Sequence, residues 1–128
     1  MHAYCLEWLH QKLKPGSKVL DVGCGSGYLT AAFYEMVKDD KSEGTRVVGI
    51  EHIDPLAIFA LENLRKSYRT ELDTSKIKVI SGDGRLGYPE DSPYDVIHVG
   101  AAAPSVPKAL VEQLAIGGIL VIPVGTTN

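Results

Sequence analysis

The chain has 128 residues, the usual length of one domain, and 45% of them are hydrophobic while 23% are charged. This balance predicts one globular domain over 1–128 and excludes a disordered chain. The net charge of −3 excludes the basic surface that binds nucleic acids and acidic membranes, so we expect neither as a partner.

The cysteine pattern and the absence of targeting signals indicate where the protein resides. Cys5 and Cys24 lack the spacing of a metal site or of a disulfide scaffold. No apolar run reaches the roughly 18 to 20 residues that span a bilayer. Residues 1–10 also lack the charged start and apolar core of a secretion signal. A cytoplasmic location is therefore expected.

Helical and strand patterns alternate along the chain, beginning with a helix that ends before Pro15 and Gly16. This alternation predicts a parallel sheet with right-handed crossovers. Near-continuous apolar strands suit a sheet covered on both faces, so the expected fold class is a doubly wound, mainly parallel α/β domain. The predicted strands are 18–22, 45–50, 76–80, 94–99 and 119–124, and the later helices are about 26–38, from 54 onward, and 105 or 107 to 115.

The helix that starts near residue 54 has the clearest local signals. Asp54 is expected to cap it, Pro55 suits its first turn, and Ile53 can pack on Ile58. A buried stripe and a basic C-terminal end are predicted from Leu56, Ala60 and Leu64 and from Arg65, Lys66 and Arg69.

Open α/β sheets bind ligands at the carboxyl ends of their strands, and the first such loop runs from Asp21 to Gly27. Its glycines, among them Gly23 and Gly25, permit a close backbone approach, and the next helix presents free N–H groups. A pyrophosphate-binding G-x-G-x-x-G pattern would place its last glycine at Tyr28, and Asp21 would repel phosphates. The loop argues against a dinucleotide oxidoreductase and suits a ligand with a cationic amino acid portion. A generic strand-to-helix turn is the alternative.

Acidic residues also follow the second and third strands. Glu51 can chelate ribose hydroxyls, although acids are common at strand ends without a ligand. His52 either contacts the ligand or faces solvent. Asp83, beside Gly84, can accept a hydrogen bond from the adenine amine, or else it is a surface residue in a turn.

Small residues follow the fourth strand and suggest a floor on which a second substrate can lie close to the ligand. These are residues 100–104. Within the strand region, Asp95 is interpreted as structural and His98 as a buried histidine with its hydrogen bonds satisfied. No N/D-P-P-Y stretch is present, which further lowers the case for a nucleic-acid substrate.

Taken together, the segments 19–31, 48–53, 82–88, 94–104 and 117–125 resemble the protein-L-isoaspartate (D-aspartate) O-methyltransferases. The resemblance covers essentially the whole chain. It implies a Rossmann-like class I methyltransferase core that uses S-adenosyl-L-methionine. It also implies methyl transfer to the free carboxylate of L-isoaspartyl residues in damaged proteins, with isoaspartyl peptides and proteins as partners and a monomeric enzyme.

The resemblance assigns donor contacts to Gly23, Cys24, Gly25, Glu51, His52, Asp83 and Gly84. The charge argument for the first loop adds Asp21 to the expected donor-binding residues. The family often has Ser at the position of Cys24 and commonly Asp at that of Glu51. Its active-site serine falls upstream of Met1, so no catalytic residue and no metal ligand is assigned here. Further strands of the family fall beyond Asn128, and we expect a core that is truncated at both ends. A small-molecule methyltransferase with the same donor loops, or a donor-binding fragment without turnover, are the alternatives.

Overall fold

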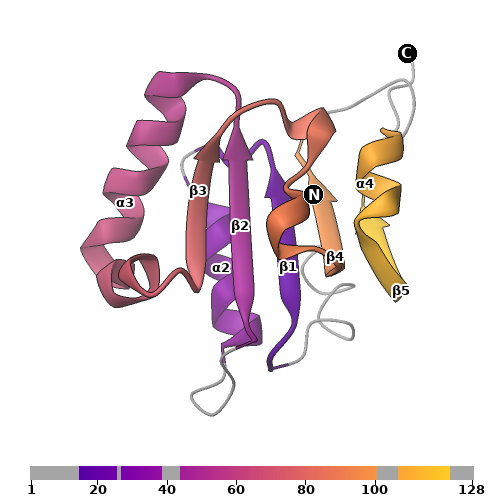
Figure 1. Cartoon of the computed structure of the whole chain (residues 1–128). Coiled ribbons are helices and arrows are strands. Elements are labelled where there is room, and N and C mark those ends of the chain that lie inside the picture. Colours follow the sequence, from indigo (N-terminus) through magenta and orange to yellow (C-terminus); the bar gives the residue numbers. More distant parts are fainter. Residues whose placement is uncertain (1–14, 26, 39–43, 101–106, 122–128) are drawn as a thin grey trace, which may run out of the picture.

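The computed structural model describes residues 15–25, 27–38, 44–100 and 107–121. Their strands form one five-stranded parallel sheet in the order β3-β2-β1-β4-β5 (Figure 1). The predicted doubly wound α/β architecture is confirmed. The elements of the structure are β1 (Lys18–Val22), α2 (Tyr28–Val37), β2 (Arg46–Glu51), α3 (Asp54–Asp73), β3 (Ile77–Ser81), the 3₁₀ turns η1 (Gly84–Leu86) and η2 (Pro89–Asp91), β4 (Tyr94–Val99), α4 (Lys108–Glu112) and β5 (Leu114–Val121).

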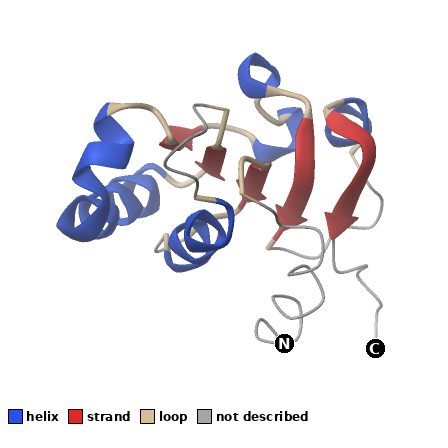
Figure 2. Cartoon of the chain, turned by 90° about the horizontal axis from the view of Figure 1, so that it is seen from below, coloured by secondary structure: helices blue, strands red, loops and turns tan. Residues whose placement is uncertain are grey.

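Helices and turns cover both faces of the sheet, as Figure 2 shows. Alternate strand residues point to opposite faces, and each face has its own hydrophobic core. On one face, Val19 and Val47 pack with Phe33 of α2 and Leu64 of α3. On the other face, the cluster includes Leu20, Val48, Tyr94 and Leu110. The central strand β1 is therefore sandwiched between two layers, which fixes the loop that follows it.

The helix α3 differs from its prediction at both ends. Asp54 lies inside the helix, and Ile53 occupies the N-cap position without a side-chain capping bond. The Asp54 carboxylate instead accepts a hydrogen bond from the Ser81 hydroxyl at the end of β3. Ala57 is buried where Leu56 was expected, while Ala60 and Leu64 are buried as predicted.

The C-terminal end of α3 lies farther along the chain than the sequence indicated. The helix continues to Asp73 across a kink at Tyr68, so its last turn holds no basic residue. Arg65, Lys66 and Arg69 therefore lie within the helix and not at its C-terminal dipole. The expected electrostatic role of these three residues at the helix end is wrong.

The segment after β4 differs most from its prediction. The helix α4 ends at Glu112, and β5 begins at Leu114, where helix had been expected as far as residue 115. Gly117 and Gly118 lie inside β5, because the pairing with β4 shifts register there. Gly117 has a φ of 81°, a left-handed conformation that glycine adopts easily and that is typical of a β-bulge.

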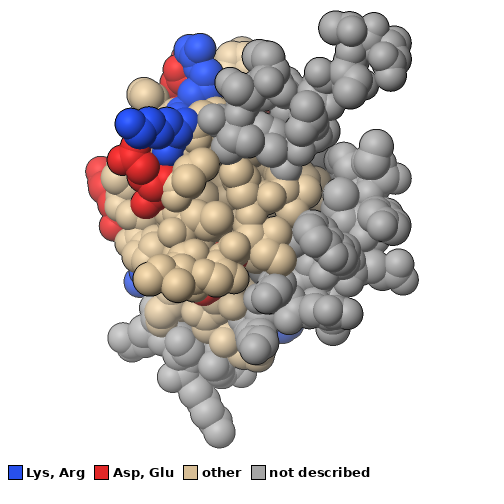
Figure 3. All heavy atoms as spheres, turned by 90° about the vertical axis from the view of Figure 1, so that its right-hand side faces the viewer, with Lys and Arg blue, Asp and Glu red and all other residues tan. Residues whose placement is uncertain are grey.

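The two edges of the sheet have different surfaces. The described surface on the β5 side is dominated by uncharged side chains (Figure 3). On it, Val111 is 52% exposed and Ile116 is fully exposed. The β3 edge, in contrast, is flanked by charged residues of α3. None of the described helices is both long and apolar enough to cross a membrane.

Candidate functional site

The candidate site lies where the carboxyl ends of the parallel strands meet. Strand order reverses beside β1, because β2 lies on one side of it and β4 on the other. This switch point is where open α/β sheets leave a crevice for ligands. The loops after β1, β2 and β3 therefore lie together at the carboxyl end of the sheet, as we predicted from the acidic residues near the ends of these strands.

The glycine loop after β1 is held by backbone hydrogen bonds to β2. The N–H groups of Gly23 and Cys24 donate to the Ile50 carbonyl at 2.7 and 3.1 Å. Gly23 and Gly25 have φ angles of 80° and 54°, which glycine adopts without strain. A side chain at Gly25 would meet no atom within 4 Å. Gly25 therefore faces open space, as a ligand-binding loop requires.

Asp21 turns its carboxylate into the protein. It is 1% exposed, accepts a hydrogen bond from the Thr30 hydroxyl at 2.8 Å, and lies 3.3 Å from Nδ1 of His98. These contacts tie β1 to α2 and to β4. The interpretation of His98 as a buried histidine with a partner is confirmed, whereas direct contact between Asp21 and a ligand stays a prediction.

Glu51 joins the glycine loop to the start of α3. It is 5% exposed, and its carboxylate accepts hydrogen bonds from the backbone N–H of Gly25 at 3.0 Å and of Ile53 at 3.3 Å. Nδ1 of the exposed His52 lies 3.5 Å from the same carboxylate. The Glu51 carboxylate is therefore fixed at the end of β2, beside Gly25, which borders open space.

Asp83 follows β3 and forms the N-cap of η1. Its carboxylate accepts a hydrogen bond from the Arg85 backbone N–H at 2.9 Å and faces the Arg85 guanidinium at 2.9 Å. These contacts with Arg85 hold the pKa of the Asp83 carboxyl below its usual range, so it is ionised at neutral pH. Arg85 was not singled out from the sequence, although its place two residues after an acid in a turn was the available signal.

Gly84 is needed for packing against the protein itself. A Cβ atom at this position would lie 2.3 Å from Cγ1 of Val22. The turn after β3 therefore lies directly on the end of β1. This close contact requires a glycine here, and a contact between Gly84 and a ligand stays a prediction. By contrast, a Cβ at Gly82 would meet nothing within 4 Å.

Cys24 is a packing residue and not a nucleophile. Burial, with smaller contributions from the nearby Asp21 and Glu51 carboxylates, raises the pKa of its thiol to about 12. The thiol therefore stays protonated at neutral pH, and thiolate is the reactive form. Beneath it lies Gly49, where a Cβ would come within 3.0 Å of the Cys24 Cβ.

The loop after β4 is described only at its start. The Gly100 N–H donates to the Val22 carbonyl at 2.8 Å, which places Gly100 beside the start of the glycine loop. The small-residue stretch 101–104 lies outside the described residues. In the described part of the chain, no group of three or more His, Cys, Asp or Glu side chains could hold a metal ion.

Comparisons with known proteins agree with this geometry. A model of the family protein-L-isoaspartate (D-aspartate) O-methyltransferase matches residues 1–128. Protein-L-isoaspartate O-methyltransferase 1 of Arabidopsis thaliana is 52% identical over 98% of this chain and 53% of its own. The Triticum aestivum enzyme is 54% identical over 98% of this chain and 54% of its own. The chain thus spans about half the length of these curated relatives.

A solved structure shows the same fold with a ligand. A Plasmodium falciparum chain described as a protein-L-isoaspartate O-methyltransferase, in complex with S-adenosyl-L-homocysteine, superposes with a TM-score of 0.89. It is 36% identical, and the match covers 99% of this chain and 60% of that one.

Proposed function

Because the chain belongs to the protein-L-isoaspartate (D-aspartate) O-methyltransferase family, we propose that the protein methylates L-isoaspartyl residues with S-adenosyl-L-methionine. The supporting observation is the convergence of Glu51, Gly25 and Asp83 at the carboxyl ends of β1 to β3. The Plasmodium falciparum structure with S-adenosyl-L-homocysteine has the same fold and supports the same donor.

In this proposal the described loops hold the three portions of the donor. The Glu51 carboxylate binds the ribose hydroxyls, with His52 beside it, and Asp83 accepts a hydrogen bond from the adenine amine. The backbone of Gly23 to Gly25 holds the amino acid portion. Cys24 is a small residue that lets the loop lie close to the donor. Asp21, behind the loop, contributes a negative charge that suits the cationic amino acid portion.

The proposed reaction needs positioning more than proton transfer. The acceptor is a carboxylate with a pKa of about 3 to 4, so it is already ionised at neutral pH and needs no general base. An alignment of carboxylate oxygen, methyl carbon and sulfonium sulfur is worth roughly 7 to 11 kcal/mol. The backbone amide nitrogen of the next residue then attacks the methyl ester and releases methanol, which gives a succinimide. Hydrolysis of this ring by water partly yields normal aspartate, so the reaction repairs damaged proteins. No side chain of the described residues is assigned as catalytic.

The decisive experiment compares two peptides that differ only in one linkage. The protein with its complete native sequence is incubated with S-adenosyl-L-methionine labelled in the methyl group. We expect label in the isoaspartyl peptide and none in the matching aspartyl peptide. Equal labelling of both, or of neither, contradicts the proposal. Labelling of small metabolites alone would indicate a small-molecule methyltransferase with the same donor loops.

A donor-binding role without turnover is the second candidate for residues 1–128 alone, because they span about half the length of the curated relatives. Calorimetry with S-adenosyl-L-homocysteine on this chain, beside the methylation assay, separates the two. Binding without turnover indicates that the chain supplies the donor site only. Turnover by the chain itself contradicts this second candidate.

The role of Asp83 can be tested separately. Asp83→Ala should weaken S-adenosyl-L-homocysteine binding by about five- to a hundredfold, because the adenine amine loses its acceptor. Glu62→Ala, which removes an exposed acid from α3, is the matched control and should bind normally. Unchanged affinity in Asp83→Ala contradicts the assignment. The cytoplasmic location and the monomeric state stay predictions.

A further inference from the structure

In the described part of the chain, β3 is the last strand on its side of the sheet. The Val47 N–H donates to the Lys76 carbonyl at 2.9 Å, and the Gly82 N–H donates to the Glu51 carbonyl at 3.0 Å. The even-numbered residues of β3 therefore direct their backbone groups toward β2. Since backbone direction alternates along a parallel strand, the N–H and C=O of Val79 point away from β2. Among the described strands none pairs with β3 on that side.

A groove runs along this edge between β3 and α3. Its volume is about 720 Å³, and it is open to solvent. Leu61, Arg65, Arg69 and Leu72 line it from α3 at helical spacing, and β3 contributes its length from Ile77 to Ile80. The groove thus combines apolar side chains, the outward backbone N–H and C=O groups of β3, and two guanidinium groups.

The charges of the groove select an acidic occupant. Arg65 and Arg69 lie about one helical turn apart, and both are exposed. Within the described structure neither guanidinium group forms a hydrogen bond or an ion pair. Asp73 is the one acid among the described lining residues. The residues that line the groove therefore carry a net positive charge, although the net charge of the whole chain is −3.

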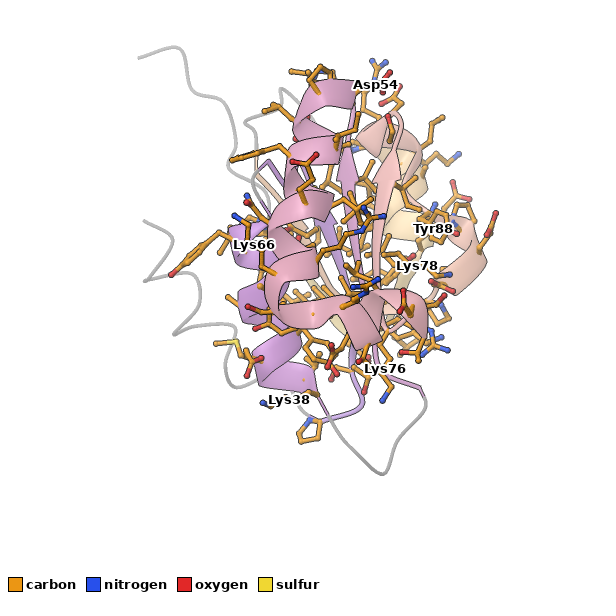
Figure 4. The ribbon with its side chains drawn as sticks, turned by 90° about the vertical axis from the view of Figure 1, so that its left-hand side faces the viewer. Lys38, Asp54, Lys66, Lys76, Lys78 and Tyr88 are labelled. Atoms are coloured by element: carbon orange, nitrogen blue, oxygen red, sulfur yellow. The ribbon has the colours of Figure 1, made fainter. Side chains whose placement is uncertain are left out.

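Lys78 does not add to this excess, because it is already paired. Its ammonium group lies 2.9 Å from the Asp91 carboxylate and 5.3 Å from the centre of the Tyr88 ring. Figure 4 looks at this edge of the sheet, with Lys78 and Tyr88 on one side and Lys66 on the far side of α3. The two arginines that line the groove are therefore the cations left for a partner.

We propose that this β3 edge groove binds an acidic polypeptide segment in extended conformation, which adds to β3 as a sixth strand. The backbone of the segment pairs with the outward N–H and C=O of Val79. Side chains that point to the α3 side of the added strand, two residues apart, meet Arg65 and Arg69. This surface lies outside the donor loops, so its occupancy is independent of the proposed methyl transfer.

The first test measures binding by fluorescence anisotropy with the protein in its complete native sequence. The probe is a labelled ten-residue peptide in which Glu alternates with Thr or Val, and the reference peptide has Lys in place of Glu. We expect the acidic peptide to bind and the basic one not to bind. Arg65→Glu with Arg69→Glu should weaken binding by about tenfold or more. Lys66→Glu reverses one charge of α3 outside the groove lining, as each single arginine variant does within it, and should leave binding unchanged.

The second test asks whether backbone pairing occurs. Val79→Pro removes the outward N–H but no ladder bond, and proline is tolerated on an edge strand in that orientation. We expect Val79→Pro to bind the acidic peptide more weakly than the parent protein, although both arginines are still present. An acidic peptide methylated on its backbone nitrogens should also bind weakly, and this arm does not depend on the folding of a variant.

Three outcomes overturn the proposal. Equal loss of binding in Lys66→Glu and in the arginine variants would indicate nonspecific charge attraction. Undiminished binding of the N-methylated peptide would exclude strand addition. Binding of a DNA oligonucleotide that depends on the two arginines but tolerates Val79→Pro would make the groove a general anion surface. Donor binding by calorimetry should be unchanged throughout, which distinguishes failure here from failure of the proposed function.

Discussion

Gly84→Ala should destabilise the fold through one identifiable contact. The added Cβ would lie 2.3 Å from Cγ1 of Val22, whereas carbon atoms in contact prefer about 3.5 to 4.0 Å. One of the two segments must therefore move by more than about 1 Å. Val22 is β-branched and stiff at χ1, so it cannot swing away easily. Overpacking of this kind costs about 1 to 3 kcal/mol in the free energy of unfolding.

Urea denaturation followed by circular dichroism measures this cost, with Gly82→Ala as the matched control. The Gly82 control should stay within about 0.5 kcal/mol of the parent, because its Cβ meets nothing within 4 Å. In a Val22→Ala background, Gly84→Ala should cost much less, which gives a favourable coupling of about 1 kcal/mol or more. A full cost that persists without the valine methyls would refute the reasoning.

Three further predictions concern buried or partly buried groups. Because the pKa of the Cys24 thiol is raised from 9.0 to about 12, its alkylation at pH 8 should be about a thousandfold slower than that of an exposed cysteine; rapid labelling in a mass-spectrometric time course would disagree. Burial and the hydrogen bond to Glu35 raise the pKa of Tyr68 from 10.0 to about 12. The folded state therefore retains that proton between these values, and the free energy of unfolding should fall more steeply with rising pH from 10 to 12 than in Tyr68→Phe; parallel curves would refute this. Thr30→Val should lose about 1 to 3 kcal/mol in urea denaturation, since it removes the 2.8 Å hydrogen bond to the buried Asp21; a neutral result would show that the carboxylate finds another donor.

The strands β1 to β4 were predictable because each is a short apolar run bounded by glycine, proline or polar residues. The stretch 47–50 is one example, and the acid that follows it was correctly placed at a strand end. Parallel strands all have their carboxyl ends on the same side of the sheet. The order of strands and acids in the sequence was therefore enough to predict that Glu51 and Asp83 lie at the same end. The all-parallel sheet and its cover on both faces were likewise predictable.

What the sequence did not reveal depends on distant contacts. The sequence did not indicate that the Asp21 carboxylate contacts His98, which lies 77 residues farther along the chain. Residues 114 and 115 were predicted to be helical, yet they begin β5, whose irregular pairing at the following glycines exists only against β4. Leu56 carries a strong hydrophobic signal, but in the structure it is 38% exposed while the smaller Ala57 is buried.

The Asp21–His98 contact also has a kinetic meaning. It joins β1 to β4, as does the hydrogen bond from the Lys18 N–H to Asp95, and each spans 77 residues of chain. Closing so long a loop is slow compared with forming α2 or α3. The donor end of the sheet should therefore be completed late in folding, after the helices exist. A ligand that binds only this completed end slows unfolding and leaves the refolding rate nearly unchanged.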